Sequence, residues 1–208
     1  MSETLLEGLE GARAGYVLAH GAGAGMKHPF MAAVAKGLAG RSIATLRYEF
    51  PYMQAKSKRP DPPKVAQAAV RAALEEARAR MPKLPLFAGG KSFGGRMTSQ
   101  AQAADLLPGV RGLIFLGFPL HAAGKPSDER AKHLFDVKVP MLFLQGSRDS
   151  LADLSLLEPV VKKLGARATL EIFEDADHSF HVPARTGRKD SEVMDDLVER
   201  MARWIGKY

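Results

Sequence analysis

The chain has 208 residues, of which 46% are hydrophobic and 25% are charged, as is usual for one globular domain with a substantial core. It contains no cysteine, which excludes disulfide bonds, thiolate metal sites and a cysteine nucleophile. The formal net charge is +7. The cations are scattered and have no interleaved aromatic residues, so we expect no nucleic-acid partner.

The beginning of the chain has neither a basic segment nor a long apolar one, so we expect no secretory signal. No apolar run approaches the roughly 18 residues that a membrane span needs. No repeat, low-complexity tract or interdomain linker is present. We therefore expect one domain over residues 1–208, with a cytoplasmic location and no membrane partner.

Short apolar runs alternate with longer helical patterns, as is typical of βαβ units around a parallel sheet. About six strands are predicted, over residues 15–19, 42–48, 84–88, 111–117, 139–145 and 168–173. An edge strand over residues 5–9 is a weaker signal. Helices are predicted over residues 30–38, 64–80, 92–104, 151–164 and 192–205. Right-handed crossovers would place helices on both faces of a mostly parallel sheet, giving a three-layer α/β fold.

A serine framed by two glycines follows the third of these strands. In Gly90-Lys91-Ser92-Phe93-Gly94, the pattern is a strand, then G-x-S-x-G, then a helix. A nucleophile on such a sharp turn needs small neighbours two positions away on either side. Its hydroxyl would project from the carboxyl end of the strand, at a helix N-terminus that favours developing negative charge. Ser92 is therefore the candidate nucleophile.

The Lys91-Ser92 pair also matches the end of the phosphate-binding motif G-x-x-x-x-G-K-[ST]. That motif requires glycine where this chain has Pro85. Residues 85–88 are apolar and belong to the predicted strand, which leaves no loop to wrap a phosphate. A nucleotide-binding site at this turn is therefore disfavoured.

A nucleophilic serine needs a histidine to accept its proton and a carboxylate to orient that histidine. On turns of this kind, the acid and then the histidine follow the serine in the chain. Asp149 comes after the strand at 139–145, with Asp153 and Glu158 as rivals. His178 comes after the last strand, with His181 as its rival. We predict that Asp149 and His178 complete the site.

The glycine-rich loop at residues 20–25 follows the first predicted strand, where a backbone N–H for a tetrahedral oxyanion is expected. We predict that Ala22, or Gly23 beside it, donates one hydrogen bond. The N–H of Phe93, directly after the nucleophile, would donate the other.

The same loop resembles the dinucleotide fingerprint G-x-G-x-x-G/A, but Met26 occupies the place of the last small residue. No histidine has companions at convincing metal-ligand spacing. We expect neither a cofactor nor a metal, and a small-molecule acyl substrate as the partner of the site.

These segments together resemble the α/β-hydrolase superfamily over residues 15–205. More narrowly, the chain is similar to small dienelactone-hydrolase-like members and to the hydrolase-like domain of a nonspecific-lethal chromatin complex subunit. The segments that carry the resemblance are residues 20–23, 90–96, 117–121, 124–126, 145–149 and 177–180.

The resemblance implies an α/β-hydrolase fold and a serine hydrolase that cleaves a small carboxylic ester or related acyl compound, with Ser92, Asp149 and His178 as catalytic residues. The short chain implies that the first two strands of the usual eight are missing or reduced. Residues 118–136 leave room only for a small flap, so we expect a minimal or absent lid. The alternative is a non-catalytic interaction module that retains the fold, because fold does not dictate function.

Overall fold

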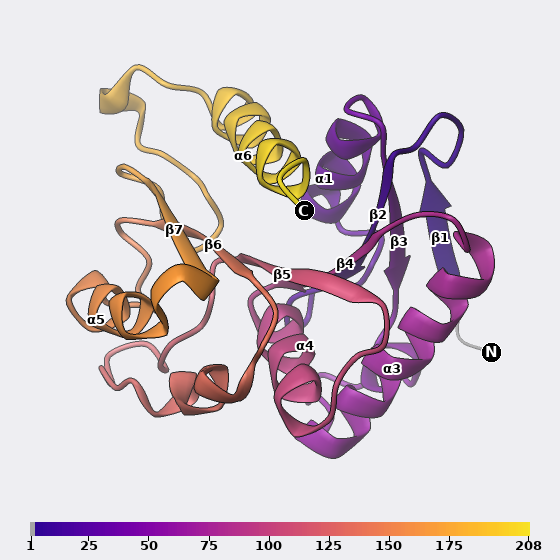
Figure 1. Ribbon diagram of the computed structural model, residues 1–208. Helices are drawn as coiled ribbons and strands as arrows, with labels where there is room; N and C mark the ends of the chain where they lie inside the picture. The colour runs from indigo at the N-terminus through magenta and orange to yellow at the C-terminus, as the bar shows by residue number, and fades with distance from the viewer. Residues whose placement is uncertain (1–2) are drawn as a thin grey trace.

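The computed structural model describes residues 3–208, which form a seven-stranded sheet (Figure 1). The strands are β1 (Thr4–Glu7), β2 (Ala14–Ala19), β3 (Ile43–Tyr48), β4 (Leu86–Lys91), β5 (Val110–Leu116), β6 (Met141–Gly146) and β7 (Ala168–Phe173). Their order across the sheet is β1-β3-β2-β4-β5-β6-β7. Every neighbouring pair is parallel except β1 with β3, which is antiparallel.

The sheet has one strand more than the sequence predicted. β1 pairs with β3 from Thr4 opposite Tyr48 to Glu7 opposite Thr45, close to the edge strand considered over residues 5–9. This agrees with the expectation that the first two strands of the usual eight are missing or reduced, because the sheet has seven strands and β1 has only four residues. Four residues are too few to show a clear periodic pattern in the sequence.

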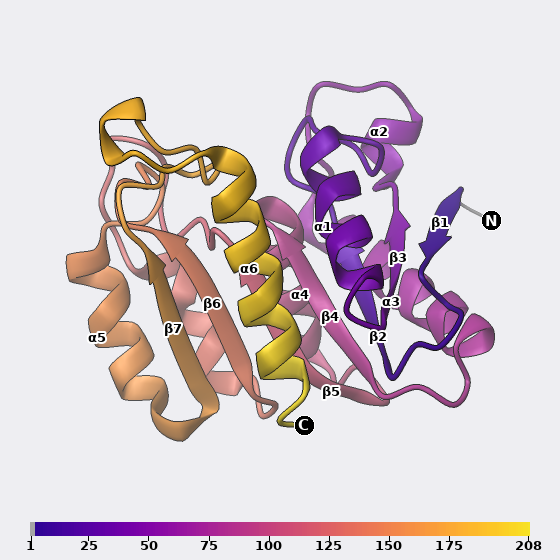
Figure 2. The ribbon, with the colours of Figure 1, turned by 90° about the horizontal axis from the view of Figure 1, so that it is seen from above.

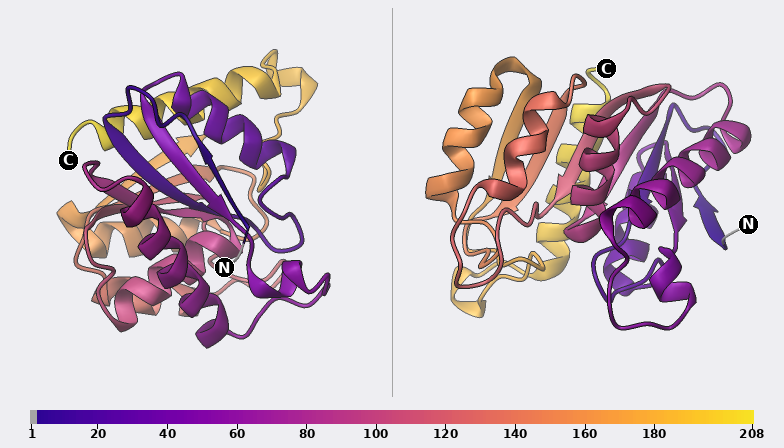
Figure 3. Two further views of the ribbon diagram at one scale, coloured as in Figure 1. Left: turned by 90° about the vertical axis from the view of Figure 1, so that its right-hand side faces the viewer. Right: turned by 90° about the horizontal axis from the view of Figure 1, so that it is seen from below.

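Helices cover both faces of the sheet and produce three layers (Figures 2 and 3). One face carries α1 (Pro29–Ala39) and α6 (Asp190–Ile205), and the other carries α3 (Pro63–Arg80), α4 (Phe93–Ala104) and α5 (Leu154–Leu164). Side chains of a strand point alternately to opposite faces. In β5, Ile114 and Leu116 join the core under α1 and α6, whereas Leu113 and Phe115 join the core on the other face. The predicted three-layer fold is confirmed.

The connection from β5 to β6 contains no helical lid. Its one regular element is the 3₁₀ helix η1 (Glu129–Asp136), which packs against α4. There His133 Nε2 lies 2.7 Å from the hydroxyl oxygen of Ser99. The remaining short elements are α2 (Pro51–Gln54), η2 (Gly165–Arg167) and η3 (Ala184–Thr186).

All five long helices begin at residues other than those predicted, α1 and α3 by one residue. α4 begins at Phe93 because Ser92 has a positive φ and cannot be helical. α5 begins at Leu154, where the Asp153 carboxylate accepts a hydrogen bond from the backbone of Ser155. α6 begins at Asp190, two residues earlier than predicted. Within residues 3–208, no helix is both long and apolar enough to span a lipid bilayer.

Because the central strands are parallel, their carboxyl ends lie at one edge of the sheet, where such sheets place their ligands. β2 ends beside His20, and β4 runs into Ser92. The loop after β6 carries Asp149, and the loop after β7 carries His178. The topology therefore delivers all the candidate residues to the same edge.

Candidate active site

The turn between β4 and α4 holds Ser92 in a strained conformation, with φ of 49° and ψ of −114°. Such positive φ values are uncommon for residues other than glycine. A Cβ on Gly90 would lie 2.1 Å from the carbonyl oxygen of Ala19, and one on Gly94 would lie 2.6 Å from that of His20. Both glycines are therefore required for the turn to pack against β2. Residues 86–91 belong to β4 and leave no phosphate-binding loop.

The structure brings Ser92, His178 and Asp149 together. Nε2 of His178 lies 2.9 Å from Oγ of Ser92, and Nδ1 of His178 lies 2.6 Å from Oδ2 of Asp149. The carboxylate accepts a hydrogen bond from Nδ1–H, and the lone pair of Nε2 therefore faces the serine hydroxyl. This is the arrangement that general-base activation of a serine needs.

Asp149 is held by more than the histidine. Its Oδ1 accepts a hydrogen bond of 2.8 Å from the backbone of Leu151, and its Oδ2 accepts one from the side-chain amide of Gln145. Gln145 is itself fixed by the backbone N–H of Phe118, at 2.9 Å. The carboxylate side chain is fully buried. Its orientation toward His178 is therefore set by the protein interior.

The rival residues have other roles. The side chain of Asp153 caps α5, and its backbone N–H donates a hydrogen bond of 2.9 Å to Nε2 of His121. His181 pairs with Asp190 at 2.7 Å on the surface, and both side chains are exposed. Neither Asp153 nor His181 is hydrogen-bonded to Ser92 or to His178.

The loop after β2 lies beside the nucleophile. A Cβ on Gly21 would lie 3.8 Å from Cβ of Ser92. The N–H of Gly23 is donated to the hydroxyl of Tyr52 at 2.9 Å, so Gly23 is not free to bind an oxyanion. The N–H groups of Ala22 and Phe93 have no hydrogen-bond partner within residues 3–208.

Side chains of the segment after β3 hold this loop in place. His20 donates from Nδ1 to the carbonyl of Gly21 at 2.8 Å, and its Nε2 accepts from the backbone of Phe50 at 3.1 Å. Burial lowers the pKa of His20, which agrees with this neutral tautomer. Glu49 accepts from the N–H of Met26 at 2.7 Å. Both ends of the loop are therefore tied to residues 49–50.

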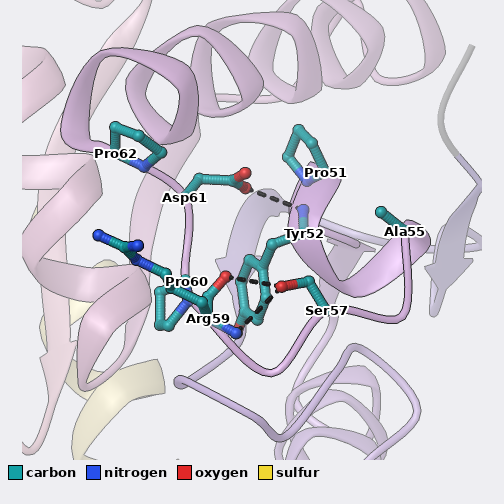
Figure 4. Close-up of a pocket in the computed structure, with 8 residues that line it drawn as sticks. All are labelled: Pro51, Tyr52, Ala55, Ser57, Arg59, Pro60, Asp61 and Pro62. Carbon is teal, nitrogen blue, oxygen red and sulfur yellow. Dashed lines mark hydrogen bonds between the residues drawn. The ribbon is translucent and has the colours of Figure 1, made fainter.

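Tyr52 joins the loop to the nucleophile turn. Its ring lies 6.3 Å from the ring of Phe93 and 6.0 Å from that of His20, in edge and tilted contacts. Its backbone N–H is donated to Asp61 at 3.0 Å, as Figure 4 shows. Its ring also lines an open surface hollow between Pro51 and Pro62, on the outer side of the segment.

A pocket of about 430 Å³ opens at Ser92. Apolar side chains of Phe30, Met31 and Leu151 form part of its wall, and His178 lies at its edge. No residue of the connection 118–136 lines it. That connection lines a separate hollow near Asp149 with His121, so the small flap expected there does not cover the pocket.

Among residues 3–208, no three histidine, aspartate or glutamate side chains converge in a way that would hold a metal ion. The titratable groups of the site instead pair with one another, as Asp149 and His178 do.

Comparison with known proteins decides the family. A family model described as an alpha/beta hydrolase domain matches residues 12–206. The chain belongs to this α/β-hydrolase family. Strands β2 to β7 lie within the matched residues, and β1 precedes them.

Solved structures share the fold at low sequence identity. An alpha-beta serine hydrolase homologue from Coxiella burnetii is 18% identical, with a TM-score of 0.76 over 96% of this chain and 89% of that chain. XC6422 from Xanthomonas campestris, described as a serine hydrolase without lid, is 24% identical, with a TM-score of 0.74 over 97% and 88%. A dienelactone hydrolase from Anabaena variabilis is 21% identical, with a TM-score of 0.76 over 99% and 91%.

These likenesses show the fold of the α/β-hydrolase and include dienelactone-hydrolase-like neighbours. The narrower similarity to a chromatin complex subunit stays a prediction.

Two residues of this α/β-hydrolase site were not found as such from the sequence. Tyr52 lies 29 positions after Gly23, and the sequence did not indicate a contact between Lys91 and His178. The Nζ of Lys91 donates a hydrogen bond to the carbonyl of His178. No local pattern links either pair, because both contacts join loops that only the sheet brings together.

Proposed function

We propose that this chain is a serine hydrolase that cleaves a small carboxylic ester through an acyl-enzyme on Ser92. The observation that carries the proposal is the pair of contacts made by His178, 2.9 Å to Ser92 Oγ and 2.6 Å to the buried carboxylate of Asp149. Related acyl compounds, such as thioesters and dienelactones, undergo the same chemistry.

In the proposed first half of the reaction, Oγ of Ser92 attacks the carbonyl carbon while Nε2 of His178 takes the hydroxyl proton. The negative charge of Asp149 stabilises the imidazolium that forms. The bond to the leaving alcohol then breaks, and His178 gives the alcohol its proton. In the second half, water replaces the alcohol, and the same proton transfers release the acid and restore Ser92.

The proposed oxyanion donors are the N–H groups of Ala22 and Phe93. Support comes from their lack of a protein partner within residues 3–208. Ala22 also lines the same pocket as Ser92, and Phe93 follows Ser92 directly in the chain. Phe93 is also the first residue of α4, whose dipole favours negative charge at this end. Gly23 is dropped from the proposal because its N–H is used by Tyr52.

A small substrate fits the pocket best. Its volume of about 430 Å³ suits a short acyl group, and its wall is apolar at Phe30, Met31 and Leu151. A long chain would leave the pocket with nothing to cover it, since the connection 118–136 does not reach this opening. A longer acyl chain gains binding free energy only where its additional methylenes are buried away from water.

The test is hydrolysis of 4-nitrophenyl acetate by the wild type, by Ser92→Ala and by Ser179→Ala. Ser179 is an exposed serine that lines the same pocket and is therefore a matched control. We expect Ser92→Ala to lose roughly four or more orders of magnitude in kcat and Ser179→Ala to stay close to the wild type. Equal activity of wild type and Ser92→Ala would contradict the proposal. An inactive wild type would favour a non-catalytic role for the fold.

A further inference from the structure

The half-buried side chain of Lys91 lines the pocket beside the proposed nucleophile and has no part in the mechanism described so far. Lys91 is the last residue of β4, immediately before Ser92. Its Nζ lies 5.8 Å from the ring centre of Phe30 and 5.5 Å from that of Phe180, in cation–π contacts. The side chain is thus enclosed between α1 and the loop that follows β7.

Hydrogen bonds join the loop that carries His178 to the loop after β6. The loop that carries His178 forms a tight turn in which Oδ1 of Asp177 accepts hydrogen bonds from the backbone of Ser179 at 2.7 Å and of His181 at 3.0 Å. Both bonds lie within the turn and do not connect it to the nucleophile strand. The hydrogen bond from Lys91 Nζ to the carbonyl of His178 makes that connection.

The same ammonium lies close to the imidazole. A Cβ placed on Gly117 would be 3.0 Å from Nζ of Lys91 and 3.3 Å from Nδ1 of His178, so both groups approach Gly117 together. Nζ of Lys91 and Nδ1 of His178 are therefore separated by no more than the sum of these two distances.

Three further charged or titratable groups surround the ammonium. The carboxylates of Asp149 and Asp177 act on it from the loops after β6 and β7, and His28 lines the pocket beside α1. Burial lowers the pKa of Lys91 to about 8, and the two carboxylates oppose that shift. At neutral pH, most of the population therefore carries the positive charge.

From this geometry we infer that Lys91 is a positioning residue for the proposed hydrolysis. Its ammonium ties the backbone carbonyl of His178 to the end of the nucleophile strand, which keeps the imidazole within hydrogen-bond distance of Ser92 Oγ. The inference rests on the proposed function, and it adds a role to the residue that directly precedes the serine.

The test compares the wild type with Lys91→Met, which keeps the length of the side chain without its charge or its hydrogen-bond donors. The quantities measured are kcat and KM for 4-nitrophenyl acetate. In Lys91→Met we expect kcat to fall by roughly tenfold or more and KM to change little, because His178 is less well held beside Ser92. Lys83→Met, which removes an exposed lysine, is the control and should match the wild type. A value of kcat within twofold of the wild type would overturn the inference while leaving the role of Ser92 intact.

A chemical rescue separates the ammonium from general damage to the fold. Because the chain has no cysteine, Lys91→Cys carries a single thiol. Aminoethylation of this variant in denaturant, followed by refolding, restores an ammonium of nearly the original length. Recovery of kcat supports the inference, with refolded wild type as the reference. Full refolding, judged by circular dichroism, without recovery of kcat contradicts it.

Discussion

The hydroxyl of Tyr52 accepts a hydrogen bond of 2.9 Å from the backbone N–H of Gly23. The bond connects the segment after β3 to the loop that supplies one proposed oxyanion donor, Ala22. Asp61 in turn holds the backbone of Tyr52 at 3.0 Å. The shape of the loop beside Ser92 therefore depends on the side chain of Tyr52, which lies in the segment after β3.

Replacement of Tyr52 by phenylalanine keeps the ring contacts with His20 and Phe93 and removes only the hydroxyl. The N–H of Gly23 then has no acceptor, and the loop is freer to move Ala22 out of line. We expect kcat to fall by about three- to tenfold, the equivalent of one hydrogen bond, with little change in KM. Steady-state kinetics of ester hydrolysis measures both.

The matched control is Tyr208→Phe, which removes a tyrosine hydroxyl from the exposed end of the chain. It should leave kcat unchanged. An unchanged kcat in Tyr52→Phe, or a loss that falls only on KM, would contradict the role assigned to the Tyr52 hydroxyl.

Asp149→Asn keeps the shape of the side chain and removes its charge. The amide no longer stabilises an imidazolium, and it does not fix the tautomer in which Nε2 faces Ser92. We expect kcat to fall by about three to four orders of magnitude. Asp153→Asn is the control, since Asp153 only caps α5, and asparagine is also a good N-cap residue. Comparable losses in the two variants would contradict the assignment of Asp149.

His133 gives a pH dependence of stability. Burial, as the main cause, and the positive charge of Arg96, as the second, lower the pKa of His133 to about 4. In the unfolded chain the group titrates near 6.5, so between these values the unfolded state binds more protons. The stabilisation is therefore present above about pH 6.5 and is lost as the pH falls toward 4, by at most about 3 kcal/mol.

Urea unfolding of wild type and His133→Gln at pH 7 and pH 4.5 measures this loss. We expect the free energy of unfolding of the wild type to decrease more than that of the variant over this interval. Parallel decreases in the two proteins would show that His133 is not responsible.

The open pocket predicts the dependence of activity on acyl length. Methylenes beyond the pocket stay in water and contribute little of the roughly 0.8 kcal/mol that a buried methylene supplies. We expect kcat/KM for 4-nitrophenyl esters to stop rising at about four acyl carbons. A steady increase from acetate through octanoate would indicate that a cover forms over the pocket in solution.

The fold was predictable because its signals are local and repeated. Buried strands such as residues 111–117 and 139–145 appear as apolar runs, and glycines 90 and 94 mark the turn at Ser92. A parallel sheet then places the loops after its strands at one edge. For this reason the sequence identified residues that the structure brings within hydrogen-bond distance, Ser92, His178 and Asp149.

The contacts that sequence analysis missed depend on the three-dimensional arrangement of loops. Gly23 and Ala22 are equivalent as donors in the sequence, and only the position of Tyr52 distinguishes them. The helix expected from residue 151 begins at Leu154, because Asp149 accepts the N–H of Leu151 and bends the chain there. β1 was underestimated because its pairing with β3 depends on a register that four residues do not reveal.

The central claim is that Ser92 is the nucleophile activated by His178. Its most direct test is the site of covalent modification by a fluorophosphonate, mapped by mass spectrometry of the digested protein. We predict one adduct, on Ser92, that is absent from Ser92→Ala and forms roughly a thousandfold or more slowly in His178→Ala. Modification of another serine, or equal labelling of wild type and Ser92→Ala, would contradict the claim.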